Sequence, residues 1–213
     1  MDLDGKIFNH FLDLDPKFIS EYINYVYEKE IMDSDTPDYT SIWMRGDYEV
    51  VMLRAIEDVY KNEQKSSLIT DNYINKFFIL SEKGKKHPEI REKQDRLLKD
   101  LIRCQHQDST FMRFIFGIIA HFPPESRNKF IATFIEYNKS IDAFRELPLE
   151  PNSWGWSGSA VPMLQKRLDY FETLMPLLNT VDLLEHKHYI EMIIQEIQLR
   201  IESEKKKDFM EED

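Results

Sequence analysis

Residues 162–201, PMLQKRLDYFETLMPLLNTVDLLEHKHYIEMIIQEIQLRI, contain two apolar patterns with helical spacing, separated by a short polar turn. The first repeats at intervals of four, three, four and three residues, at Leu164, Leu168, Phe171, Met175 and Leu178. The second repeats at intervals of four, three and four residues, at Ile190, Ile194, Ile197 and Ile201. Because only Asn179-Thr180 separates them, the two stripes predict an antiparallel hairpin of helices, over 162–178 and 181–205.

The spacing of apolar residues before this hairpin also predicts helices. Helices are predicted at 16–30, 48–62, 88–103, 110–122, 125–138 and 140–146. Two short segments, 40–44 and 66–70, have β-strand character, but neither requires a sheet. The predicted fold class is therefore all-α: an irregular multi-helix array of helical hairpins, with HEAT-like repeats left open, that ends in the long antiparallel hairpin.

Several helix ends carry recognisable local signals. Asp15-Pro16 predicts a helix start, with a capping residue followed by proline in the first turn. Asp108 or Ser109 is expected to cap the helix that follows it, and Pro124 to open the next one. In the helix at 48–62, Val50 and Leu53 are expected to face the core together with Val51, Ile56, Val59 and Tyr60.

Composition limits the function classes. The 213 residues are 42% apolar and 31% charged, as in globular proteins, and the net charge is −11. So acidic a chain is a poor candidate for a broad nucleic-acid-binding surface. Cys104 is the only cysteine and the acidic N-terminus lacks the features of a signal peptide, so a cytoplasmic location is expected. The most apolar segment, 111–122, is too short to span a membrane, so no membrane association is expected.

The segment PNSWGWSGSAVP, residues 151–162, divides the chain into predicted parts. These are a helical array at 1–147, a connector at 148–161, and the hairpin with a charged tail at 162–213. Gly155 and Gly158 permit a sharp turn, Trp154 and Trp156 provide large apolar surfaces, and Pro162 opens the next helix. We interpret these five residues as a structural joint; an exposed aromatic platform for a ligand is the alternative.

The joint predicts a stability effect. If Trp154 or Trp156 is buried against the hairpin, its replacement by alanine should cost about 3–5 kcal/mol. Denaturant unfolding measures that cost. If both variants unfold like the parent but lose partner binding, the structural-joint interpretation is wrong and the aromatic-platform alternative replaces it.

No catalytic constellation and no cofactor-binding motif is found. In the connector, the second glycine lies one place too early for a G-x-S-x-G nucleophile elbow, and no P-loop motif occurs. Glu185-x-x-His188 has the spacing of a di-iron ligand pair, but the chain has no second E-x-x-H. His186 and His188, two residues apart, are expected on different sides of the helix. A polar helix face is the simpler interpretation; a metal-binding protein or enzyme using Glu185 and His188 is the alternative.

Two further segments have a possible binding role. Residues 83–103 contain eight Lys or Arg and could contact nucleic acid. Acidic residues four places before several of these bases favour a solvated helix face instead, as in Glu89–Lys93 and Glu92–Arg96. Arg45-Gly46-Asp47 has the sequence of an adhesion tripeptide, but a structural role in a turn ahead of a helix is the simpler interpretation.

Residues 141–197 resemble the C-terminal helical region of large bacterial P-loop NTPases of the STAND type, which are linked to phage defence. The resemblance is carried by Ser153-Trp154, Gly158-Ser159, Val161-Pro162 and the run Leu183-Leu184-Glu185-His186. It implies a non-catalytic scaffold or sensor module that acts by protein–protein interaction, as the regulatory part of such an NTPase. The implied partner is an NTPase core or a trigger protein. The chain lacks nucleotide motifs, so no ATPase activity is expected of it.

Overall fold

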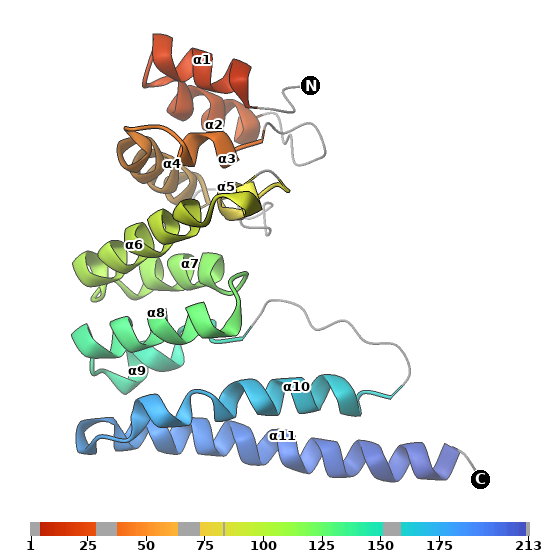
Figure 1. The fold of residues 1–213 in the computed structure, drawn as a ribbon. Coiled ribbons are helices and arrows are strands. Elements are labelled where there is room, and N and C mark those ends of the chain that lie inside the picture. The colour runs from red at the N-terminus through yellow and green to blue at the C-terminus, as the bar shows by residue number, and fades with distance from the viewer. Residues whose placement is uncertain (1–4, 29–37, 64–72, 83, 151–158, 212–213) are drawn as a thin grey trace. The chain divides into compact units, whose positions relative to one another are not determined.

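The computed structural model describes residues 5–28, 38–63, 73–82, 84–150 and 159–211, with side chains to residue 207. In this part of the chain every regular element is a helix, which confirms the all-α class (Figure 1). None of these helices combines the length and the hydropathy needed to cross a bilayer. The chain divides into two compact units, residues 1–100 and 101–213, so the predicted connector lies within the second unit.

The first unit consists of short and medium helices. They are α1 (Lys6–Leu14), α2 (Phe18–Glu28), α3 (Thr40–Trp43), α4 (Tyr48–Glu63), α5 (Asn75–Phe78) and most of α6 (Pro88–Gln105), which runs on into the second unit. Helices α2 and α4 pack against each other. Polar contacts join them at their edges, with the Ser20 hydroxyl 2.5 Å from Asp58 Oδ2 and Asn62 Nδ2 2.9 Å from Asn24 Oδ1.

The predicted start of α2 is two residues early. Helix α1, which the sequence patterns do not predict, ends at Leu14, and Asp15 follows it in extended conformation. The Asp15 carboxylate accepts the backbone N–H of Lys17 at 2.8 Å, so it caps a turn rather than the helix itself. Helix α2 therefore begins at Phe18.

The segment 40–44, considered above as a short strand, is helical over Thr40–Trp43. Asp38 Oδ1 accepts the N–H of Thr40 at 2.9 Å and so initiates a turn. Trp43 is fully buried, and its indole Nε1 donates to the carbonyl of Phe77 at 2.7 Å. This bond fixes the short helix within the core. The other candidate strand, 66–70, lies outside the described residues.

The predicted inner face of α4 is partly wrong. Val50 is 61% exposed and Leu53 is 38% exposed. The buried residues are Tyr48, Val51, Met52, Ala55, Ile56 and Val59, which recur at intervals of three and four residues and form one stripe. Val50 and Leu53 lie about one residue's rotation to either side of this stripe, beyond the part of the helix that the neighbouring elements cover.

After the last residues of α6, the second unit contains an apolar pair of helices, α7 (Ser109–Ile119) and α8 (Pro124–Tyr137), followed by the short α9 (Ile141–Arg145). Asp108 caps α7 as predicted, since its carboxylate accepts the N–H of Phe111 at 2.9 Å. Pro124 is in the first turn of α8, also as predicted. Aromatic rings join the two helices, with Phe116 and Phe134 edge to face at 5.8 Å.

The predicted terminal hairpin is present. Helix α10 (Val161–Glu172) lies beside α11 (Leu184–Glu211), and short 3₁₀ turns at Met175–Leu178 and Val181–Leu183 connect them (Figure 1). Both predicted stripes supply buried residues: Leu164, Leu168, Phe171, Leu178, Ile190, Ile197 and Ile201. The first helix is shorter than predicted because Pro176, without an N–H, interrupts it.

Candidate interaction surface

The predicted joint is only partly described. Trp154, Gly155, Trp156 and Gly158 lie outside the described residues, so their predicted bracing role stays a prediction. Pro162 is in the first turn of α10, as predicted, and it is exposed.

The residues just before the joint are tied to α10. The Arg167 guanidinium forms two hydrogen bonds with the Glu150 carboxylate, at 2.6 and 2.7 Å, and the Tyr170 hydroxyl donates to the carbonyl of Leu149 at 2.6 Å. Parallel bonds of this kind are among the stronger ion pairs in proteins. No local pattern predicts this ion pair, because Glu150 and Arg167 are seventeen residues apart.

The Glu185/His188 pair does not gather further ligands. Both residues are exposed on α11, and the nearest partner of His188 is Glu191, with His188 Nδ1 3.9 Å from Glu191 Oε2. His186 is buried, so the two histidines point to different sides as predicted. Within the described residues, no three His, Cys, Asp or Glu side chains are grouped closely enough to hold a metal ion.

Two bases of the 83–103 segment contact aromatic residues of the first unit. Lys93 Nζ donates to the carbonyl of Trp43 at 2.5 Å and lies 4.6 Å from the ring centroid of Tyr48. Arg96 donates to the Tyr48 hydroxyl. Lys93 and Arg96 therefore help to attach α6 to the α3–α4 corner, a role that the predicted pairs with Glu89 and Glu92 did not suggest.

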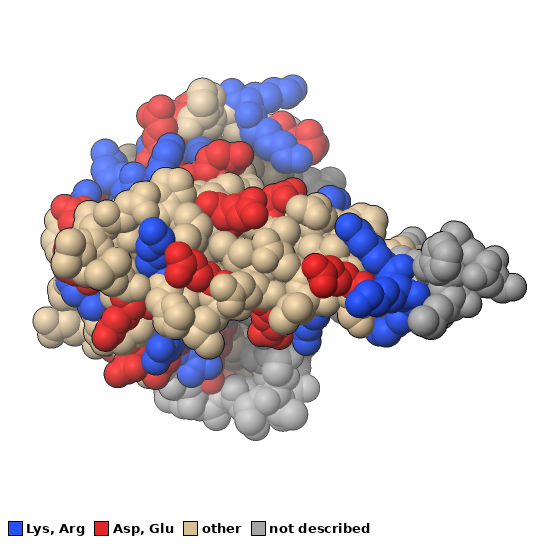
Figure 2. Space-filling view, turned by 90° about the horizontal axis from the view of Figure 1, so that it is seen from below, with Lys and Arg blue, Asp and Glu red and all other residues tan. Residues whose placement is uncertain are grey.

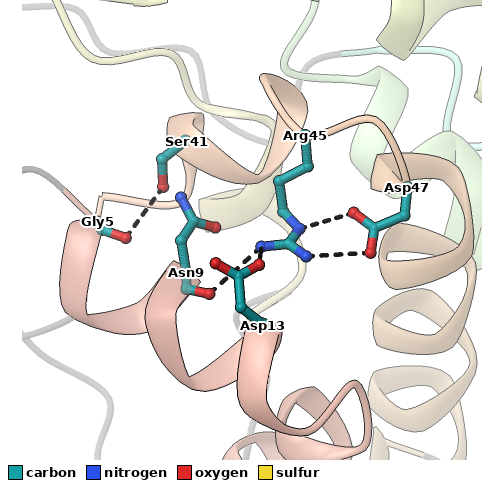
Figure 3. A network of polar contacts seen from close by, with 6 residues as sticks. All are labelled: Gly5, Asn9, Asp13, Ser41, Arg45 and Asp47. Atoms are coloured by element: carbon teal, nitrogen blue, oxygen red, sulfur yellow. Dashed lines mark hydrogen bonds and ion pairs between the residues drawn. The ribbon is translucent and has the colours of Figure 1, made fainter.

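Arg45, from the tripeptide Arg45-Gly46-Asp47, forms the centre of a polar network (Figure 3). Its guanidinium donates to both carboxylate oxygens of Asp47 at 2.7 and 3.0 Å, to Asp13 at 2.6 Å, and to the carbonyl of Asn9 at 3.3 Å. The bonds with Asp47 raise the pKa of Arg45 and lower the pKa of Asp47. This network ties α1 to the turn before α4, in agreement with the structural interpretation of the tripeptide.

Among the described residues of the first unit, the carboxyl group with the largest pKa shift is that of Glu63, which lies beside a cluster of tyrosines. The Tyr39 hydroxyl lies 3.1 Å from that of Tyr22 and 2.5 Å from that of Tyr73. Nearby, the Tyr27 hydroxyl is 3.4 Å from Glu63 Oε1. Burial raises the pKa of Glu63 to about 7. Groups with strongly shifted pKa values occur in functional sites as well as in protein cores. This cluster joins the ends of α2 and α4, so we interpret it as a polar part of the core.

Arg127 and His186 are the buried basic side chains among the described residues of the second unit. Arg127 is 5% exposed; its Nε and Nη1 atoms have no hydrogen-bond partner, and its guanidinium lies 4.3 Å from the ring centroid of Tyr170. His186 is 1% exposed, neither ring nitrogen has a hydrogen-bond partner, and its ring meets Phe144 edge on at 4.9 Å. Burial lowers the pKa of both groups.

The outer side of α11 offers the clearest interaction surface. Leu184, Met192 and Leu199 are 57%, 54% and 67% exposed, with the exposed His188 and Gln195 between them. We call these five residues the outer row. They recur at intervals of four, four, three and four residues, so they share one helix face, opposite the buried Ile190, Ile197 and Ile201. Figure 2 views this side of the molecule, where uncharged surface is interspersed with acidic and basic side chains.

Part of the outer row was visible in the sequence. Met192 and Leu199 lie off the predicted hairpin seam, as do Leu174 and Leu177, and this position indicates that all four need a partner other than the facing helix. The structure buries Leu174 and half-buries Leu177 within the second unit, which leaves Met192 and Leu199 exposed. No protein-family model, no curated protein and no solved structure matches the chain, so its function has to be argued from these residues.

Proposed function

We propose that this chain is a non-catalytic helical scaffold or sensor module that binds a protein partner through the outer row of α11. From the sequence resemblance, we propose that the chain is the regulatory C-terminal part of a bacterial STAND-type defence NTPase and acts in the cytoplasm. The partner would be the NTPase core or a trigger protein.

The observation that supports this proposal is the exposed apolar content of the outer row. Leu184, Met192 and Leu199 are each more than half exposed on a helix whose opposite face is buried. Single exposed apolar residues are common on protein surfaces, but several on one helix face suit a partner that packs against it. An amphipathic helix docking in this way would use residues about one turn apart as anchors.

The experiment compares partner capture by matched variants. The tagged chain is expressed in its source cells, and captured proteins are quantified by mass spectrometry. Leu199→Glu places a charge in the outer row, whereas Val50→Glu places one at a similarly exposed apolar site in the first unit. We expect a P-loop NTPase or a trigger protein to be captured by the parent and by Val50→Glu, and to be lost with Leu199→Glu. Equal capture by all three chains would contradict the proposal.

A further inference from the structure

We propose that the guanidinium of Arg127 is a binding site for a carboxylate group, at the place where the start of α8 meets the end of α10. This inference goes beyond the proposed function and does not depend on it, because the outer row of α11 takes no part in the site. Three observations carry it: the burial of Arg127 without hydrogen-bond partners, the contacts that hold its side chain in place, and the exposed residues beside it.

Arg127 is buried without the partners that a guanidinium requires. The residue is 5% exposed, and its Nε and Nη1 atoms have no hydrogen-bond partner. A guanidinium has several N–H donors, no acceptor, and a charge that it retains in proteins. Burial lowers the pKa of Arg127, and Tyr170 and Glu125 oppose this effect only in part. The cost of removing the charge from water is therefore already present in the folded chain, and a bound anion offsets part of it.

Neighbouring side chains hold the guanidinium in place. Its central carbon lies 4.3 Å from the ring centroid of Tyr170, in the last turn of α10. The Tyr170 hydroxyl donates to the carbonyl of Leu149 at 2.6 Å, which fixes the ring. The next residue, Asn128, donates to the Thr173 hydroxyl at 3.0 Å and so joins the start of α8 to the end of α10. A charged group held in this way loses little further freedom when a ligand binds.

The charges around Arg127 favour a carboxylate over a phosphate. A carboxylate accepts parallel bonds from a guanidinium and neutralises its single charge. Arg127 is also in the first turn of α8, where the positive end of the helix dipole favours an anion. A phosphate would bring a second negative charge close to Glu125, in a chain whose net charge is −11. Desolvating that second charge in a buried site is also costly.

The site lies close to the surface. Glu125, two residues before Arg127, is exposed, and so is Thr173, three residues after Tyr170. A small group therefore needs only a movement within one helical turn to reach the guanidinium. Because a ligand of this size makes few contacts, we expect a dissociation constant on the order of millimolar.

The first test is an NMR titration of the purified full chain with sodium acetate, compared with sodium chloride at the same ionic strength. The Nε–H signal of Arg127 is identified by its absence from the spectrum of Arg127→Lys. We expect this signal to shift with acetate until the site is saturated, and to stay in place with chloride. A signal that does not move with acetate, or that moves equally with chloride, would overturn the inference.

The second test compares thermal unfolding in the same two salts. Saturating acetate should raise the unfolding midpoint of the parent by about 2–4 °C relative to chloride. Arg113→Met is the matched control and should keep this gain, because Arg113 is an exposed arginine on α7 of the same unit. Arg127→Met should lose the gain, and its circular dichroism spectrum shows whether it folds like the parent. An equal gain in all three chains would mean a general salt effect and would contradict the proposal.

Further probes in the NMR titration distinguish the source of the carboxylate. A short glycine peptide with blocked ends carries one glutamate as its only charge. If this peptide shifts the Arg127 signal as acetate does, the site accepts an acidic side chain of a protein. If only acetate shifts it, the ligand is a small free carboxylic acid. Tighter binding of inorganic phosphate than of acetate would rule out the assignment to a carboxylate. None of these outcomes affects the outer row, which Leu199→Glu tests separately.

Discussion

Each unit contains an arginine that is shielded from solvent, and the two differ in how their guanidinium groups are hydrogen-bonded. Arg45, in the first unit, has a side chain that is 14% exposed and is bonded to two carboxylates and one carbonyl. Arg127, in the second unit, is 5% exposed; its Nε and Nη1 atoms have no hydrogen-bond partner, and it lies over the Tyr170 ring. The pKa of Arg45 is raised by its bonds with Asp47, whereas burial lowers the pKa of Arg127.

This difference indicates that a buried charge stabilises a fold only when other groups compensate for the lost hydration. The bonds of Arg45 replace the water that the guanidinium loses, and they connect two segments of chain. The ring of Tyr170 compensates Arg127 only in part, since a cation–π contact contributes about 0.5–2 kcal/mol. Desolvating an ion that lacks partners costs several kcal/mol. The two arginines should therefore respond very differently to replacement by an apolar side chain.

The difference between the two arginines can be tested directly, and it gives the largest effect expected from comparing the two units. Arg45→Met should lower the free energy of unfolding of the first unit by about 1–2 kcal/mol, because Asp13 and Asp47 lose their shared partner. Arg127→Met should change the stability of the second unit by less than about 0.5 kcal/mol or raise it, since methionine fills similar space without the charge. Urea unfolding of both variants measures the effects. A greater loss for Arg127→Met would mean that its guanidinium is compensated.

A second contrast concerns Glu63 in the first unit. Its folded pKa of about 7 is higher than its ordinary value of 4.5, because the carboxyl group is partly buried. Between these values the folded chain binds more protons than the unfolded chain, so this contribution to stability falls as the pH rises from 4.5 to 7. Glu63→Gln should therefore be stabilised relative to the parent above pH 7 but not below pH 4.5. Urea midpoints of the parent and the variant, measured across this pH range, test the prediction. A difference between the two midpoints that stays constant with pH would contradict it.

The smallest expected effect is the pH dependence of stability that comes from His186 in the second unit. Its direction is opposite to that of Glu63. Its folded pKa lies below the ordinary 6.5 because burial disfavours the charged ring. The unfolded chain therefore binds more protons below pH 6.5, and this contribution to stability falls as the pH falls. Glu185 and Asp182 favour the charged ring, and Lys139 and Arg145 disfavour it.

His186→Leu should remove this acid-side loss of stability. His188→Leu, on the exposed side of the same helix, is the matched control and should leave the loss in place. Thermal unfolding followed by circular dichroism above and below pH 6.5 distinguishes the variants. An unchanged pH dependence in His186→Leu would mean that other groups cause the loss.

Local patterns in the sequence determined most of the secondary structure of this protein. The stripes at Leu164–Leu178 and Ile190–Ile201 specified the hairpin, because residues three and four apart share a helix face whatever surrounds them. Asp108 and Pro124 likewise fixed helix starts, since capping depends only on the next few backbone N–H groups. The same period placed His186 and His188 on different sides of α11.

Which side of each helix is covered depends on the tertiary structure. Periodicity did not place the buried stripe of α4 correctly with respect to Val50 and Leu53, nor did it show that Met192 and Leu199 stay exposed while Leu174 does not. It also missed the pairing of Arg45 with Asp13, thirty-two residues away, and of Arg167 with Glu150. Burial and ion pairing depend on neighbours brought together by folding, whereas helix formation depends on neighbours along the chain.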